Sequence, residues 1–148
     1  MIQAAGSIAT AIGVLLAWWQ FRQGAIAART HFEDDLDREY RELARQIPTG
    51  ALLGKELTDN EQNESLKYFF HYVDLSNQQV FLRIHGRIGK KTWQYWCDGI
   101  ESNLARPAFQ KAWEYIKQES NSFAELRRLE ERRFKGDPAK GSRIAEGR

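Results

Sequence analysis

Apolar residues dominate the start of the chain, where no ionisable side chain precedes Arg22. An α-helix rises roughly 1.5 Å per residue, so about 20 apolar residues cross the hydrocarbon core of a bilayer. Trp18 and Trp19 stand next to the end of this stretch, as aromatic rings do at a membrane–water boundary. We predict a transmembrane helix at residues 1–22. A buried helix of a soluble oligomer is the main alternative, because many residues of the stretch are small.

Basic residues follow the predicted span and none precedes it in this sequence. Arg22 and Arg29 are the first two cations after the apolar stretch. Because cytoplasmic flanks carry an excess of Lys and Arg, we expect the C-terminal part in the cytoplasm. Cys97 is the single cysteine, so an intrachain disulfide is impossible, which fits a reducing compartment.

Small residues recur at every fourth position of the predicted span. They are Ala5, Ala9, Gly13 and Ala17. This spacing lets two helices approach closely in lipid, which predicts self-association into a homo-oligomer. An alanine-rich span also shows such spacing by chance, and both interpretations stand.

Helical periodicity continues after the apolar stretch. Apolar residues at every third or fourth position up to Ile47 predict an amphipathic stalk helix over residues 23–47, with Gly24 as its weak point. A helical bundle of about four helices is predicted over residues 51–134. Its expected start signals are the Thr58–Glu61 capping box, Thr92 as an N-cap, Pro107 in a first turn and the Ser122–Glu125 capping box.

Strict alternation of apolar and polar residues is not sustained anywhere, so the sequence predicts an all-α fold. Residues 135–148 lack an apolar stripe, are rich in Gly and Lys and contain Pro138, which predicts a disordered basic tail. The whole chain carries 5 Trp, 5 Tyr and 8 Phe. These large apolar side chains are sufficient for one hydrophobic core. The net charge of +2 gives no support for a nucleic-acid partner.

The sequence offers few candidates for catalytic or metal-binding residues. The chain has no hydrolase signature, and Cys97 has no histidine or basic residue one helical turn away, so we predict a buried thiol and no catalytic residues. His31 precedes Asp34, and His71 precedes Asp74, by three positions, but two ligands do not make a metal site. We therefore predict no metal and no cofactor.

Four basic residues surround the connection before the predicted helix that starts near Thr92. They are Arg83, Arg87, Lys90 and Lys91. Together with the N-terminus of that helix they predict a weak site for a phosphate or a lipid headgroup. The alternative is a solvated connection in which Gly86 caps the preceding helix. The segment does not have the glycine spacing of a nucleotide-binding phosphate loop.

A polar patch from Asp74 to Gln79 interrupts the apolar stripe of the predicted helix that starts at the Thr58–Glu61 capping box. Such a patch is either exposed or buried with partners. We expect His71 or Arg106 to pair with Asp74 in a structural network rather than Asp74 to act as a catalytic carboxylate.

The sequence resembles a largely uncharacterised bacterial family of short proteins that have one N-terminal span and a small helical domain of unknown function. The resemblance covers most of the chain and rests on Trp18-Trp19-Gln20-Phe21-Arg22, on residues 69–79, on Trp93-Gln94-Tyr95-Trp96 and on Arg106-Pro107-Ala108-Phe109. It implies a single-pass protein of the bacterial inner membrane and supplies no catalytic residues.

Together these features predict a membrane-anchored cytosolic interaction or regulatory module that self-associates and presents its bundle to a cytosolic protein partner. The alternative is a membrane-tethered sensor of a phosphorylated small molecule or nucleotide at the basic connection. An enzyme has the least support, because no nucleophile, base or metal set is recognisable.

Overall fold

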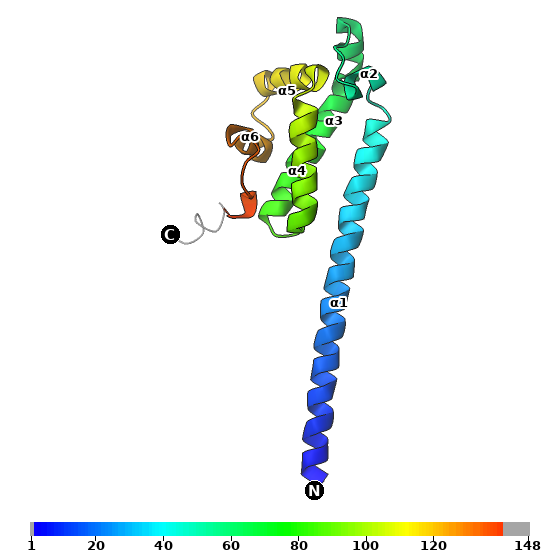
Figure 1. The fold of residues 1–148 in the computed structure, drawn as a ribbon, viewed down its shortest axis with the longest axis vertical. Helices are drawn as coiled ribbons and strands as arrows, with labels where there is room; N and C mark the ends of the chain where they lie inside the picture. Colours follow the sequence, from blue (N-terminus) through cyan, green and yellow to red (C-terminus); the bar gives the residue numbers. More distant parts are fainter. Residues whose placement is uncertain (1, 141–148) are drawn as a thin grey trace. The chain divides into compact units, whose positions relative to one another are not determined.

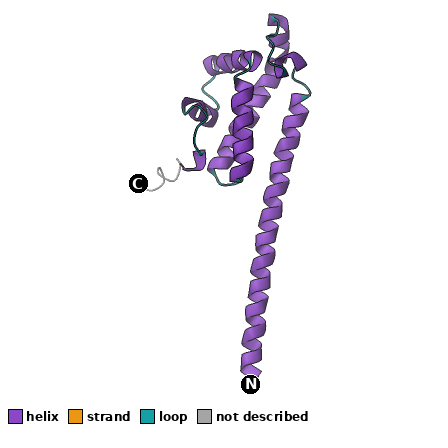
Figure 2. Cartoon of the chain, in the orientation of Figure 1, coloured by secondary structure: helices purple, strands orange, loops and turns teal. Residues whose placement is uncertain are grey.

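The computed structural model describes the backbone of residues 2–140 and the side chains of residues 12–140, and this part is helical without β-strands (Figure 2). The predicted all-α class is therefore confirmed. The helices are α1 (Ile2–Ala44), α2 (Thr49–Leu52), α3 (Asp59–Ile84), α4 (Lys90–Leu104), α5 (Pro107–Glu119) and α6 (Ala124–Glu131) (Figure 1). The chain divides into two compact units, Met1–Asp35 and Leu36–Arg148.

The first unit is a continuous part of α1, which remains helical through Gly24. Its described apolar side chains are exposed, except for the half-buried Phe32; Leu15, Leu16 and Phe21 show 64%, 54% and 80% of their surface. Within the described residues, none of the helices has the length and apolar character that crossing a membrane requires. The transmembrane helix at residues 1–22 therefore gains no support here and stays a prediction.

The small-residue stripe of α1 is only partly described. The side chains of Ala5 and Ala9 lie outside the described residues, whereas Gly13 and Ala17 are exposed. A Cβ added to Gly13 would meet no neighbouring atom. This face of the helix is therefore open along its described part.

In the second unit, α3 packs against α4, α5 and α6 (Figure 1). Its apolar positions recur at helical spacing and place Phe69, Tyr72 and Val73 in the core. The ring of Phe109 on α5 stands edge-on to Phe69 and to Tyr72, with centroid distances of 4.9 and 5.0 Å. Such edge-to-face pairs add to the stabilisation that burial of the rings provides.

The N-terminus of α3 has the predicted capping box. The backbone N–H of Glu61 donates to Thr58 Oγ1 at 3.3 Å, and the N–H of Thr58 donates to Glu61 Oε2 at 2.9 Å. These contacts satisfy two N–H groups that have no partner within the helix. The prediction from the sequence is confirmed.

Replacing Thr58 with alanine is expected to lower the free energy of unfolding of the second unit by about 1 kcal/mol, because the side-chain acceptor is lost. Chemical denaturation of the full-length chain measures this change. Thr30→Ala is a matched control, because the Thr30 hydroxyl only donates to the carbonyl of Ile26 in its own helix. Equal losses in the two variants would contradict the role of the capping box.

Two other helix starts differ from the prediction. Helix α4 begins at Lys90 with Gly89 as its N-cap, so Thr92 lies inside the first turn. Before α6, Phe123 adopts a left-handed φ of 65°, and no side chain caps the helix locally. Asn77 of α3 replaces the predicted Ser122–Glu125 box, since its Oδ1 accepts the N–H of Leu126 at 3.0 Å. Local spacing does not reveal a cap that comes from another helix.

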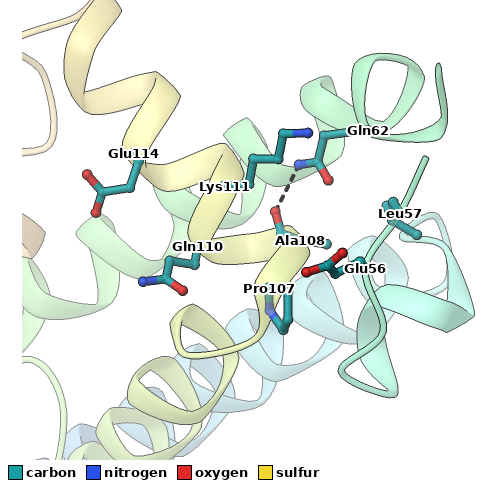
Figure 3. A pocket seen from close by; sticks show the side chains of 8 residues that line it. All are labelled: Glu56, Leu57, Gln62, Pro107, Ala108, Gln110, Lys111 and Glu114. Carbon is teal, nitrogen blue, oxygen red and sulfur yellow. Dashed lines mark hydrogen bonds between the residues drawn. The ribbon is translucent and has the colours of Figure 1, made fainter. Parts of the chain in front are cut away.

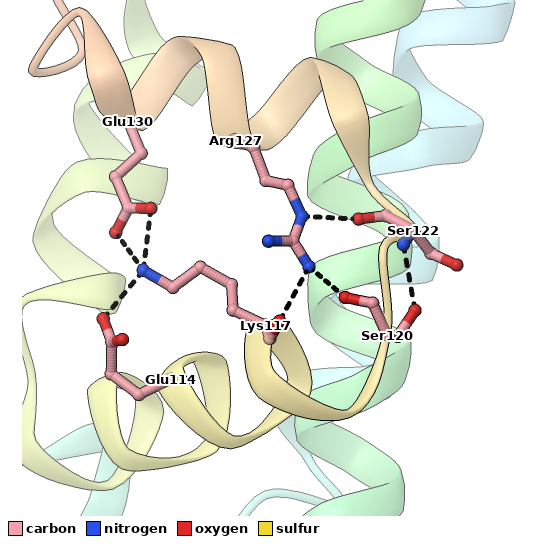
Figure 4. Close-up of polar contacts among 6 residues, drawn as sticks. All are labelled: Glu114, Lys117, Ser120, Ser122, Arg127 and Glu130. Atoms are coloured by element: carbon pink, nitrogen blue, oxygen red, sulfur yellow. Dashed lines mark hydrogen bonds and ion pairs between the residues drawn. The ribbon is translucent and has the colours of Figure 1, made fainter.

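A polar network joins helices α5 and α6 (Figure 4). It lies over Trp113, which is buried. Lys117 binds Glu114 at 2.8 Å and Glu130 at 2.9 Å. Arg127 donates to the carbonyls of Ser120 and Ser122 in the turn between the helices. Both cations also lie over the Trp113 ring, at 5.3 and 5.6 Å from its centroid. These contacts fix a turn that has few apolar residues.

Part of the segment predicted to be disordered is folded. Asp137 forms an ion pair with Arg83 of α3, and Pro138 is buried. Asp137 Oδ1 also accepts the N–H of Ala139 at 3.1 Å, which begins another helical turn. The prediction of a disordered tail is thus wrong for residues 135–140, because composition does not show the ion pair that holds them. Residues 141–148 lie outside the described residues.

Candidate functional site

The predicted anion site before α4 is largely a structural junction. Arg83 Nε donates to Asp137 Oδ1 at 2.9 Å, Nη2 donates to Oδ2, and Nη1 donates to the carbonyl of Ile88 at 2.7 Å. Arg83 thus already holds an anion, the carboxylate of this chain's own Asp137. Arg87, Lys90 and Lys91 are exposed around it.

Gly86 caps the C-terminus of α3, as expected if the connection before α4 is a solvated turn. Its φ is +70°, a conformation that glycine adopts without strain. The N–H of Arg87 donates to the carbonyl of Leu82 at 2.9 Å, which closes the last helical turn. The capping role of Gly86 is confirmed.

Asp137 makes the stability of the second unit depend on pH. Hydrogen bonding to Arg83 lowers the pKa of the Asp137 carboxyl despite its partial burial. A lowered pKa in the folded state means that the stabilisation is complete above the unfolded pKa, near 3.9, and is lost as the pH falls through the folded pKa. The ion pair is therefore fully effective at neutral pH.

We expect Asp137→Asn to lower the free energy of unfolding by about 1–3 kcal/mol at pH 7 and by much less near pH 3. Urea denaturation of both chains at the two pH values measures the difference. Asp74→Asn, which changes an exposed carboxylate of α3, is the control and should have little effect at either pH. A loss that is the same at both pH values would show that the charge of Asp137 is unimportant.

A hollow with a volume of about 560 Å³ lies between the end of α1, α3 and α4. The sequence did not predict it. Its lining combines aromatic rings with amide, carboxylate and guanidinium groups. The residues are Asp37, Tyr40, Arg41, Tyr72, Gln79, Tyr95, Trp96, Asp98, Gly99, Ile100 and Asn103.

Asn103 of α4 is the centre of the polar network in this hollow. Its Nδ2 donates to the hydroxyls of Tyr72 and Tyr40 at 3.0 and 3.3 Å. Its Oδ1 accepts from Arg106 Nη1 at 2.6 Å. The two tyrosine rings are 6.2 Å apart between centroids. One buried amide therefore joins α1, α3 and the start of α5.

Trp96 is fixed by a second polar contact with α1. Its indole Nε1 donates to Asp37 Oδ1 at 2.7 Å. A hydrogen bond to a carboxylate is stronger than one between neutral groups, so the ring has a defined position at the wall of the hollow. Tyr95, the preceding residue, is instead 75% exposed.

Gln79 is a largely buried residue of the lining whose side-chain hydrogen-bonding groups are unused. It is only 6% exposed, yet its side-chain amide forms no hydrogen bond with the described part of the chain. A primary amide carries two N–H donors and a carbonyl acceptor. The described buried atoms that lack a partner are Gln62 Oε1 and Trp113 Nε1, so the amide atoms of Gln79 are still accessible to a ligand. Gln79 is therefore the strongest functional candidate among the lining residues.

Burial raises the pKa values of Tyr72 in the hollow and of Cys97 elsewhere on α4. Burial is the main reason why the pKa of Tyr72 lies far above its usual value, so this residue remains a neutral phenol. Burial also raises the pKa of the Cys97 thiol to about 11. A thiol with that pKa is almost entirely protonated at neutral pH and is a poor nucleophile. The predicted buried, unreactive role of Cys97 agrees with these values.

The polar patch of α3 differs in detail from the expectation. Asp74 and His71 are both exposed, so Asp74 does not join a buried network. Arg106 does enter one, but it binds Asn103. The predicted pair of Asp74 with His71 or Arg106 does not form, because Asp74 lies on the solvent side of α3, whereas Ser76 and Gln79 point inward.

A second hollow of about 420 Å³ lies beside the first turn of α5 (Figure 3). Gln62 Nε2 donates to the carbonyl of Ala108 at 2.9 Å, while its Oε1 is buried without a partner. Lys111 extends over this side of α5 and binds Asp59 at 2.8 Å. Because Gln62 Oε1 is enclosed by protein atoms, this hollow is a weaker candidate than the one at Gln79.

Histidine, cysteine and carboxylate side chains do not gather in threes anywhere in the described chain, so no candidate metal centre arises there. No known protein family, no curated protein and no solved structure matches the chain.

Proposed function

We propose that this chain is a membrane-anchored helical module that self-associates through α1 and presents its second unit to a partner in the cytoplasm. The observation that carries this proposal is the set of exposed apolar side chains on α1. Its members with at least half of their surface exposed are Ile12, Val14, Leu15, Leu16, Trp18, Trp19, Phe21 and Ile26. Apolar surface of this extent favours burial in lipid or against another protein.

Three features support a bilayer as the environment of this helix. The sequence has no ionisable side chain before Arg22, and the described part of that apolar stretch begins at Ile12. The guanidinium of Arg22 lies 5.5 Å from the centroid of the Trp18 ring. An aromatic ring with a cation beside it suits the headgroup region. The third feature is the resemblance of the sequence to short single-span proteins, from which we propose the bacterial inner membrane as the location.

The second unit supports binding more than catalysis. Its main hollow contains hydrogen-bonding groups and aromatic rings but no nucleophile activated by a neighbouring base. The alternative of a phosphorylated ligand at the basic connection loses one of its four cations, because Arg83 is bound to Asp137. We therefore favour the interaction module over a sensor at that connection.

Disulfide crosslinking in membranes tests self-association. Ala17→Cys and Leu15→Cys each add one exposed thiol to α1, on nearly opposite sides of the helix. We expect a crosslinked dimer with Ala17→Cys and little with Leu15→Cys, since Ala17 belongs to the small-residue stripe. The unsubstituted chain is the background control, because Cys97 is buried. Equal crosslinking at both positions, or none at either, would contradict association through this stripe.

A further inference from the structure

The hollow at the end of α1 is lined by a largely buried glutamine, Gln79, whose amide is accessible and has no partner among the described residues. Gln79 is nine-tenths buried and lines the hollow, and no described residue accepts from or donates to its amide. By contrast, the amide of Asn103 in the same hollow is bonded at both its nitrogen and its oxygen. Gln79 therefore offers an N–H donor and a C=O acceptor side by side, which matches a ligand edge with the complementary pair.

Aromatic rings supply the second half of a recognition site. Tyr40, Tyr95 and Trp96 line the hollow together with Gln79. The Trp96 ring is held by Asp37, and the largely exposed Tyr95 ring can adjust to a ligand. A fixed ring and an adjustable ring are well suited to stack on a flat heterocycle.

We propose that this hollow binds the nucleobase of an adenine nucleoside. The Gln79 amide would pair with the adenine N6 amino group and N7, the bidentate contact that glutamine makes with this base. Stacking on the aromatic lining would hold the plane of the ring. The volume of about 560 Å³ is adequate for a nucleoside. This inference goes beyond the anchoring function and does not depend on it.

The charges of the hollow favour a nucleoside over a nucleotide. The charged lining residues are Asp37, Asp98 and Arg41, which give a net charge of −1. Arg106 is not a lining residue, and its guanidinium donates to the neutral amide of Asn103. A phosphate group in the hollow would meet two lining carboxylates and one lining guanidinium, so the lining itself offers it no net attraction. The inferred ligand therefore differs from the phosphorylated compound predicted for the basic connection.

Calorimetric titration of the full-length chain in detergent with adenosine and with AMP tests this proposal. We expect saturable binding of adenosine and binding of AMP that is several-fold weaker. Gln79→Leu keeps the size of the side chain and removes the amide, so it should weaken adenosine binding roughly tenfold or more. Tyr95→Ala should weaken it by roughly fivefold to tenfold through lost stacking.

Tyr115→Ala is the matched control, because Tyr115 is an exposed tyrosine of α5 that does not line the hollow. It should leave adenosine binding unchanged. If Gln79→Leu does not fold, adenosine binding by Tyr95→Ala tests the proposal instead. Tyr95 is exposed, so removing its ring leaves the core intact. Lack of saturable adenosine binding at millimolar concentration would overturn the proposal. Binding that is insensitive to Tyr95→Ala and is abolished by Lys90→Glu with Lys91→Glu would also overturn it.

Discussion

Replacing Phe109 with alanine is expected to destabilise the second unit by about 3–5 kcal/mol, as the removal of a large buried ring from a packed core does. The Phe109 ring is buried and stands edge-on to Phe69 of α3 and to Tyr72. Its removal leaves a cavity among rigid rings, which collapse poorly around the lost volume. Because Tyr72 also binds Asn103, the change should loosen the hollow.

Chemical denaturation followed by near-ultraviolet circular dichroism measures this loss in the full-length chain. Tyr115→Ala removes an aromatic ring of the same helix that is half-exposed, and it should change the free energy of unfolding by no more than about 0.5 kcal/mol. A loss below about 1 kcal/mol for Phe109→Ala would be inconsistent with the packing described for α3 and α5.

Introducing arginine at both Leu15 and Leu16 is expected to move most of the chain out of the membrane. Each arginine costs about 2.5–3.5 kcal/mol at the centre of a membrane helix and somewhat less nearer its end. Two such costs exceed what the weakly hydrophobic stretch can offset. Flotation of the chain with liposomes on a density gradient measures the bound fraction.

The control for this pair is Ala27→Arg with Ala28→Arg. These exposed residues of α1 follow Arg22, outside the apolar stretch, so the added charge stays in the aqueous phase. The control chain should float with the liposomes as the unsubstituted chain does. Equal flotation of both arginine pairs would mean that the apolar part of α1 does not enter the bilayer.

Sequence patterns predicted those features of the fold that depend on local spacing. The Thr58–Glu61 box and Gly86 act within a few residues of their helix ends, so their roles are visible in the sequence. Pro107 likewise begins α5 as predicted. Local chemistry and local structure agree at these positions.

Features that depend on contacts between distant residues were not predictable. Asn77 caps α6 from α3, and Asp137 binds Arg83 across 54 positions of sequence. Gln79 was recognised only as part of a polar patch, because spacing alone does not show which of its neighbours bury it. The expectation of a polar network at Asp74 is therefore wrong: its carboxylate is exposed, whereas Gln79 lines the hollow.

Alkaline carbonate extraction of membranes from cells that express the unsubstituted chain is the most direct test of the anchoring function. Carbonate releases proteins held by charge or by peripheral contacts, whereas a helix buried in the hydrocarbon core stays with the lipid. We predict that the chain remains in the membrane pellet and is released by detergent. Recovery of the intact chain in the carbonate supernatant would contradict the account and would assign the apolar face of α1 to contacts within a soluble assembly.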